Sequence, residues 1–216
     1  MINKSNIYNN YYSWWKNVDK TILILILSFF IVGLFFSLVS TSLIASDRLN
    51  TNSYYFFIKH LVFILLGLLI MFIFSLIKEE FLIKVSIIFF VISLFLLFLV
   101  PFIGAEVKGS KRWLDLPFLP RFQPVELIKP FYIVILASLL NFQKYNLYFK
   151  YFLSLLLVVP IVLLLISQPD LGQSMLIILT WLALIFISGI NLVIFFGLFG
   201  FFITIIFYLI FFVDKF

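Results

Sequence analysis

A charged, proline-punctuated segment between two long apolar runs carries the side chains of this sequence that are best suited to bind a ligand. It occupies residues 104–129 and reads GAEVKGSKRWLDLPFLPRFQPVELIK. Within it, Lys108, Lys111 and Arg112 lie close together, and Trp113 follows. A guanidinium can bind a phosphate through two hydrogen bonds, and several cations together can share two or more phosphate charges. The cluster therefore favours recognition of a diphosphate. The alternative is a solvated Arg beside a Trp that anchors the chain in a membrane interface.

A second set of polar residues, Gln123, Glu126 and Lys129, surrounds Pro124. Proline suits the first turn of a helix, where its missing N–H costs nothing, so we expect a helix to begin here. Glu126 and Lys129 are then three residues apart on one face and close enough to pair. Because a charge at mid-bilayer costs about 2.5 kcal/mol or more, such residues usually face a protein interior or a wet cavity. A functional pair is favoured over an internal ion pair that only fixes helix packing.

A third motif, Gln168-Pro169-Asp170-Leu171-Gly172, joins two apolar runs with almost no loop between them. Proline disfavours helix in the residue before it, and Asp170 can cap a helix that begins at Leu171. The motif predicts a sharp reversal of the chain near a membrane surface. A buried Asp170 carboxylate that faced the basic cluster would additionally hold a Lys or Arg in place.

The composition shows to which class of protein these motifs belong. Hydrophobic residues make up 65% and charged residues 11% of the 216 residues, and the mean hydropathy is +1.25. Such a chain has too little polar surface to cover a soluble globule. The net charge is +6, but the Lys and Arg residues are scattered over short loops instead of gathered on one polar face. This distribution argues against nucleic-acid binding and favours contact with anionic lipid. The sequence has no cysteine, which excludes disulfides and thiolate chemistry. No cofactor is established, and a divalent metal stays possible with carboxylates, phosphate oxygens or the single His60 as ligands.

Seven apolar runs approach the roughly 20 residues that cross a bilayer core, and we expect an all-α, polytopic bundle of seven spans. Helices are expected because an unpaired backbone is too costly in hydrocarbon and the alternating pattern of a membrane barrel is missing. Residues 1–19 lack the apolar core and cleavage site of a secretory signal and are expected to remain as a tail before one helical bundle, residues 20–213. The expected spans are residues 20–44, 60–77, 82–104, 125–141, 149–167, 171–188 and 191–213.

The basic residues of the loops predict the orientation of the spans. If the N-terminal tail is cytoplasmic, the loops after the second and fourth spans are cytoplasmic too, as the positive-inside tendency prefers. Alternation then places the loop 105–124 outside, where its basic cluster of Lys108, Lys111, Arg112 and Arg121 works against the same tendency. That makes the cluster a candidate for anion binding, unless Glu106 and Asp115 neutralise part of it. Residues 214–216 would emerge outside, and we expect them to begin a further outer loop that this chain lacks.

Three motifs, in order, resemble those of a known family. GAEVKGSKRWLDL, then FQPVELIKP and then QPDLG resemble the SEDS family of polytopic peptidoglycan glycosyltransferases over nearly the whole chain. The GAEVKG opening, and Trp14, Trp15 and Asp19 before the first span, are most similar to the division branch of proteobacterial type, with the elongation branch a close second. The resemblance implies a fold of about ten spans, and polymerisation of lipid II at the outer face of the bacterial cytoplasmic membrane.

The same resemblance implies partners and roles. The substrate would be lipid II, an undecaprenyl-diphosphate-linked disaccharide peptide, and the partners a class B penicillin-binding protein that supplies transpeptidation and other division proteins. The substrate-binding residues would position the substrate and set the electrostatics of its cavity rather than transfer a proton. Together, the motifs and the resemblance assign this role to Lys108, Lys111, Arg112, Trp113, Gln123, Glu126, Lys129 and Asp170.

Two departures from the family pattern matter. Val125 stands where the family has Ser, which removes a hydroxyl but keeps the Glu126 carboxylate. The acid thought to be catalytic in the family lies in the large outer loop after the seventh span, beyond residue 216, so we expect this chain alone to be inactive. Two other functions stay open: a flippase that moves the same precursor across the bilayer, and a non-catalytic division scaffold whose spans contact a partner helix.

Overall fold

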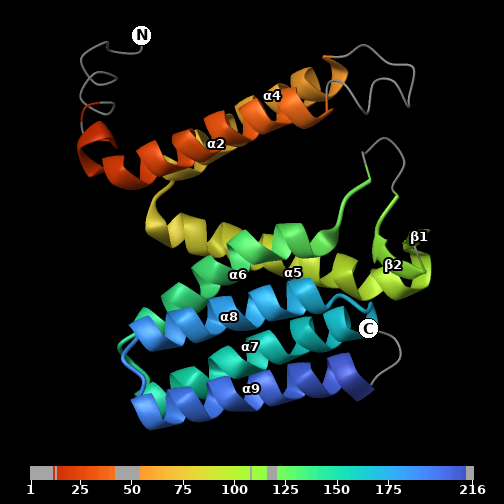
Figure 1. Cartoon of the computed structure of the whole chain (residues 1–216). Helices are drawn as coiled ribbons and strands as arrows, with labels where there is room; N and C mark the ends of the chain where they lie inside the picture. The colour runs from red at the N-terminus through yellow and green to blue at the C-terminus, as the bar shows by residue number, and fades with distance from the viewer. Residues whose placement is uncertain (1–11, 13, 42–53, 108, 116–120, 213–216) are drawn as a thin grey trace. The chain divides into compact units, whose positions relative to one another are not determined.

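The computed structural model describes residues 12, 14–41, 54–107, 109–115 and 121–212 (Figure 1). The chain divides into two compact units, Met1–Lys78 and Glu79–Phe216. Long apolar helices dominate the described residues, which confirms the prediction of a helical, polytopic membrane fold. These helices are α2 (Lys20–Thr41), α4 (Tyr55–Ser75), α5 (Glu79–Ile103), α6 (Pro124–Asn141), α7 (Leu147–Ser167), α8 (Leu171–Ile187) and α9 (Leu192–Phe212).

Each of the seven predicted spans coincides with one of these helices. By length and composition, α2, α4, α5, α6 and α7 can cross a membrane, whereas α8 and the Leu192–Tyr208 part of α9 are apolar but shorter. The largest difference at a helix start is that α4 begins at Tyr55 instead of residue 60, because the helix continues through Lys59 and His60. Residues 42–44 of the first predicted span and residue 213 of the last lie outside the described residues.

In the first unit, α2 and α4 pack against each other. Asp19 Oδ1 accepts hydrogen bonds from the backbone N of Thr21 at 2.9 Å and of Ile22 at 3.1 Å, so Asp19 caps α2. Trp14 donates from Nε1 to Ser75 Oγ at 2.9 Å. The segment that enters the first span is therefore tied to the end of α4.

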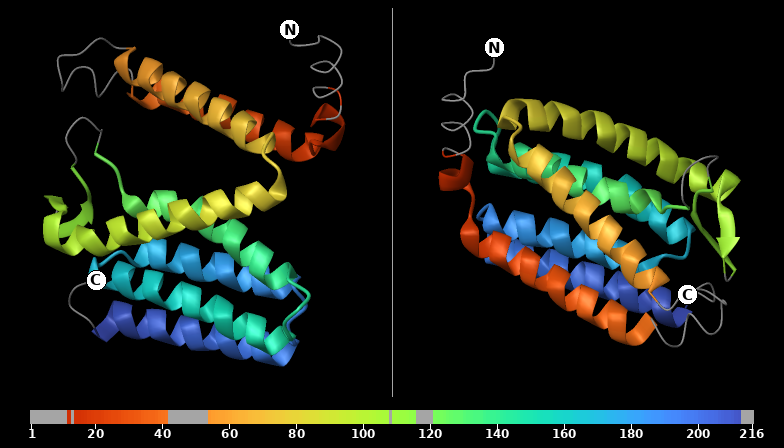
Figure 2. Two further views of the ribbon diagram at one scale, coloured as in Figure 1. Left: turned by 180° about the vertical axis from the view of Figure 1, so that it is seen from behind. Right: turned by 90° about the horizontal axis from the view of Figure 1, so that it is seen from above.

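The second unit contains α5 to α9 and holds the main core of the described residues. In this unit α6 packs against α5, α7 and α8, and α8 packs against α7 and α9 (Figure 2). Fully buried side chains from four helices fill the core, among them Leu97, Tyr132, Ile161 and Trp181. Trp181 donates from Nε1 to Ser154 Oγ at 2.9 Å and so joins α8 to α7. This core fixes α6 and α8, the two helices that carry polar motifs, relative to each other.

A β-hairpin, which was not predicted from the sequence, connects α5 to α6. Strands β1 (Ala105–Val107) and β2 (Ser110–Trp113) pair antiparallel. Gly109 lies in the tight turn between them with a φ of 79°, a value that residues with a Cβ rarely adopt. The basic residues Lys111 and Arg112 therefore lie on a strand with a fixed register.

Two further contacts join the described residues that follow the hairpin. The backbones of Leu114 and Phe122 form an antiparallel bridge. Arg121 Nη2 lies 2.7 Å from Asp115 Oδ2, so part of the predicted neutralisation of positive charge is confirmed, although it involves Arg121 and not the residues of β2.

Gly104→Ala should destabilise the second unit, because Gly104 lets the end of α5 and strand β2 approach closely. A Cβ at this position would be too close to the Val100 carbonyl oxygen and 3.2 Å from the Trp113 carbonyl oxygen. Both are backbone atoms, so relief requires a shift of the helix end or of the hairpin, and overpacking of this kind costs about 1–3 kcal/mol. We expect a lower midpoint of thermal unfolding in detergent. Gly67→Ala is the control, because a Cβ at Gly67 would meet no atom within 4 Å; equal midpoints for both variants would contradict this packing.

Candidate functional site

Three segments that are far apart in the sequence meet where α6 and α8 begin. Strand β2 carries Arg112, the first two turns of α6 carry Glu126 and Lys129, and Asp170 directly precedes α8. As predicted, α6 starts at Pro124. The three motifs singled out in the sequence therefore contribute to one site in the second unit.

Arg112 is held by the turn between α7 and α8. Its Nε donates to the Gln168 carbonyl oxygen at 3.3 Å, and its Nη2 donates to the Pro169 carbonyl oxygen. Nη1 lies 3.9 Å from Asp170 Oδ1. The side chain is 35% exposed, so backbone carbonyls fix the plane of the guanidinium while part of it stays accessible. Arg112 can therefore present N–H donors to an anion in a defined orientation.

Asp170 connects the turn, β2 and the start of α6. Its side chain is 8% exposed. Oδ2 accepts a hydrogen bond from Gln123 Nε2 at 2.7 Å, and Oδ1 accepts one from the backbone N of Gln173 at 3.4 Å. Two predictions are confirmed: Asp170 caps α8, and it is a buried carboxylate that faces a residue of the basic cluster, Arg112.

The predicted pair of Glu126 and Lys129 is also confirmed. Lys129 Nζ lies 2.6 Å from Glu126 Oε2. Gln173 of α8 joins the pair, because its Nε2 donates to Glu126 Oε1 at 3.0 Å and its Oε1 accepts from Lys129 Nζ at 3.2 Å. The pair on α6 is thus bound to the first turn of α8, directly after Asp170.

The other predicted residues lie beside this network or cannot be placed. Lys108 lies outside the described residues. Lys111 is exposed, forms no ion pair within the described part of the chain, and lines a cavity of about 390 Å³ between the hairpin and the turn before α8. Trp113 is half-buried, and its backbone pairs with Ala105. Lys111 is therefore the cation of β2 that is most open to an incoming ligand.

Two side-chain contacts of the site, made by Gln173 and Gln168, were not predicted from the sequence. Gln173 follows the cap residue Asp170 by three positions, the spacing of a capping box, and this signal was available. Gln168 is 3% exposed and donates from Nε2 to the carbonyl oxygen of Leu97 at 3.1 Å. No sequence pattern indicates the contact between Gln168 and Leu97, because the two residues are 71 positions apart, one in the turn after α7 and the other in α5.

The charges of the arrangement suit electrostatic binding of an anion. The described residues contain no group of three or more His, Cys, Asp or Glu side chains that could hold a metal ion. The Asp170 carboxylate faces Arg112, and the Glu126 carboxylate pairs with Lys129. Two carboxylates and two cations are thus balanced inside the network, and the exposed Lys111 adds positive charge next to it. Such a site can bind and orient an anionic group.

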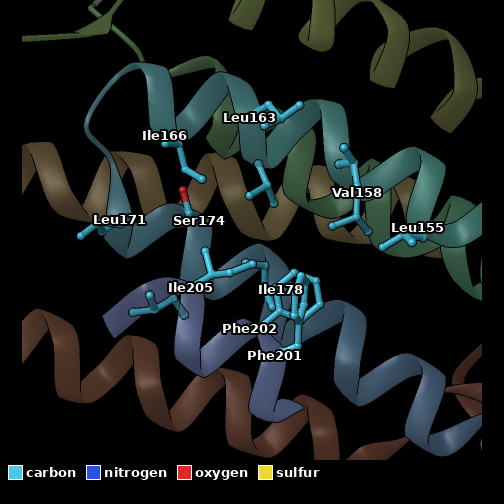
Figure 3. A pocket seen from close by; sticks show the side chains of 13 residues that line it. Leu155, Val158, Leu163, Ile166, Leu171, Ser174, Ile178, Phe201, Phe202 and Ile205 are labelled. Atoms are coloured by element: carbon cyan, nitrogen blue, oxygen red, sulfur yellow. The ribbon is translucent and has the colours of Figure 1, made fainter. Parts of the chain in front are cut away.

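An apolar cavity of about 310 Å³ lies between α7, α8 and α9 (Figure 3). Val158 of α7, Leu171 and Ser174 of α8 and Phe202 of α9 are among the side chains that line it. Ser174 Oγ donates to the Asp170 carbonyl oxygen at 2.8 Å. The cavity therefore begins within one helical turn of the charged network.

Comparison with known proteins relates the chain to bacterial cell-cycle proteins. A model of the FtsW/RodA/SpoVE family, described as cell cycle protein, matches residues 19–215. The chain is 35% identical to the probable peptidoglycan glycosyltransferase FtsW of Coxiella burnetii over 83% of its length and 49% of that protein. It is 34% identical to the probable peptidoglycan glycosyltransferase FtsW of Wigglesworthia glossinidia brevipalpis, over 88% of the chain and 51% of that protein. The chain thus spans about half the length of these curated relatives.

Solved structures show the same relationship in three dimensions. The rod shape determining protein RodA of Thermus thermophilus matches with a TM-score of 0.57 and 29% identity, over 77% of this chain and 56% of that one. A chain from a study of polymerization and crosslinking by a peptidoglycan synthase complex matches with a TM-score of 0.55 and 30% identity, over 73% of this chain and 47% of that one.

Proposed function

The chain belongs to the FtsW/RodA/SpoVE (SEDS) family, and from that premise we propose that it forms the lipid II-binding half of a peptidoglycan glycosyltransferase. The observation that carries this proposal is the network of Arg112, Asp170, Glu126 and Lys129, which brings three distant motifs together beside the exposed Lys111. Lipid II offers an anionic diphosphate next to a long apolar chain, and cations at the edge of membrane-spanning helices are suited to the diphosphate.

In this proposal the chain is a multi-pass protein of the bacterial cytoplasmic membrane with a cytoplasmic N-terminus. The hairpin and the starts of α6 and α8 then face the outer side, where the glycan strand grows. Arg112 and Lys111 bind the diphosphate that leaves when the acceptor hydroxyl attacks the sugar of the donor, since cations stabilise the charge that develops on a leaving group. Asp170 faces Arg112 and accepts from Gln123 at the start of α6, while Lys129, paired with Glu126, adds a further cation to the site.

Division is the cellular process we propose, because the two curated relatives described above are named FtsW. Elongation is the alternative, since a solved neighbour is RodA. We also propose that the protein works with a class B penicillin-binding protein, the kind of enzyme that would supply crosslinking. The likeness to a chain of a complex that polymerises and crosslinks peptidoglycan supports this partner.

Glycan-chain formation from purified lipid II tests the proposal. The chain is reconstituted alone and alongside a version extended through the downstream reading frame, because the relatives are about twice as long. Polymer from the extended version, with lipid II binding by both, is the expected result. Polymer from neither version, together with transport of lipid II across vesicles by both, would contradict the proposal and favour a flippase.

A further inference from the structure

Gln173 links the charged pair on α6 to the first turn of α8. Its amide donates to Glu126 Oε1 at 3.0 Å and accepts from Lys129 Nζ at 3.2 Å. Lys129 Nζ lies 2.6 Å from Glu126 Oε2, so the three side chains close a ring. An amide suits this place because it donates and accepts at once, whereas a carboxylate only accepts and an ammonium only donates.

The ring is attached to the rest of the site through the backbone of Gln173. The backbone N of Gln173 donates to Asp170 Oδ1 at 3.4 Å, and the Asp170 carboxylate also accepts from Gln123 and faces Arg112. We infer that Gln173 is a positioning residue, which sets the orientation of Lys129 and Glu126 relative to Arg112 before an anionic headgroup binds. This inference rests on the proposed function.

The exposure of the pair explains why a third partner matters. The side chains of Glu126 and Lys129 are 52% and 21% exposed. An exposed pair of long side chains is weak on its own, because water screens the attraction and many rotamers compete with the paired one. The Gln173 amide donates one hydrogen bond to Glu126 and accepts one from Lys129. Because α8 is packed in the bundle, these two hydrogen bonds restrict both side chains. Without Gln173 the Lys129 ammonium can turn away from the site.

The test measures the affinity of the chain in nanodiscs for lipid II, for Gln173→Leu, Lys129→Met and the double variant. We expect Gln173→Leu to weaken binding about tenfold and to have no further effect when Lys129→Met is already present, because Gln173 acts through Lys129. Unchanged affinity for Gln173→Leu would overturn the inference, as would effects of the two changes that multiply. Absence of binding by the unmodified chain would reject the proposed function and, with it, the inference.

Exchanging the amide of residue 173 with the carboxylate of residue 126 distinguishes a positioning role of Gln173 from a general loss of structure. Gln173→Glu places a second carboxylate against Glu126 and should weaken binding. Adding Glu126→Gln restores one carboxylate, one amide and the Lys129 ammonium, so affinity should return to within about threefold of the unmodified chain. No recovery relative to Gln173→Glu alone would overturn the inference. Met175→Leu is the matched control, because Met175 is exposed on the same helix and should leave the affinity unchanged.

Discussion

Arg112→Ala should abolish glycan synthesis by the extended protein while leaving the chain folded and inserted in the membrane. The guanidinium is fixed by the carbonyl oxygens of Gln168 and Pro169 and remains 35% exposed, so its loss removes oriented donors from the place where the diphosphate is proposed to bind. A hydrogen bond to a charged group contributes about 1.5–3 kcal/mol, so the loss of two such bonds predicts a fall in activity of roughly a hundredfold or more.

Growth of cells that depend on the Arg112→Ala variant, and polymer yield from lipid II, measure this effect. Arg121→Ala is the matched control, since it removes the same charge from the same connection but breaks only an exposed pair with Asp115. Arg112→Lys should recover little, because an ammonium keeps the charge and loses the planar fork. Normal growth with Arg112→Ala would contradict the assignment of this residue to the substrate site.

Asp170→Ala should lower both the free energy of unfolding and the activity. The change removes the cap of α8, the acceptor of the Gln123 amide and the counter-charge of Arg112 from a side chain that is 8% exposed. A lost helix cap costs about 1 kcal/mol, and a buried group left without its partner costs about 1–3 kcal/mol more. We therefore expect a destabilisation of about 3 kcal/mol.

Denaturation in detergent micelles, followed by tryptophan fluorescence, measures this loss. Asp170→Asn keeps an acceptor for the cap and should lose about half as much stability, but it removes the charge opposite Arg112 and should still impair synthesis. An Asp170→Ala protein with the same free energy of unfolding as the unmodified chain would show that the Asp170 carboxylate does not stabilise the fold.

The helices could be predicted from the sequence because hydrocarbon imposes a length and an apolar composition on each span. The start of α6 at Pro124 and the cap at Asp170 were predictable for a local reason, since both depend on which backbone N–H groups a helix start leaves unpaired. The pairing of Glu126 with Lys129 follows from helical spacing alone. The start of α6, the cap of α8 and the Glu126–Lys129 pair each involve residues at most four positions apart.

The remaining features depend on tertiary contacts, which local patterns do not encode. The β-hairpin is formed by strands of only three and four residues, which are too short for an alternating pattern to distinguish them from a solvated loop. The buried Lys150 shows the same limit. Lys150 lies at the start of the predicted span 149–167, and its Nζ donates at 2.9 Å to the Leu140 carbonyl oxygen at the end of α6. Only packing of α7 against α6 reveals that role.

The short length of α8 has a consequence for the membrane around the site. At 1.5 Å per residue its 17 residues span roughly 25 Å, less than the hydrocarbon core of about 30 Å. If α8 crosses the bilayer, this hydrophobic mismatch is relieved by local thinning of the bilayer, or by water and headgroups that reach down to the start of the helix. Asp170 and Arg112 lie at that start, so the lipid that we propose as ligand would then meet these residues below the general level of the surrounding headgroups. The depth of the site relative to the headgroups therefore depends on the thickness of the bilayer.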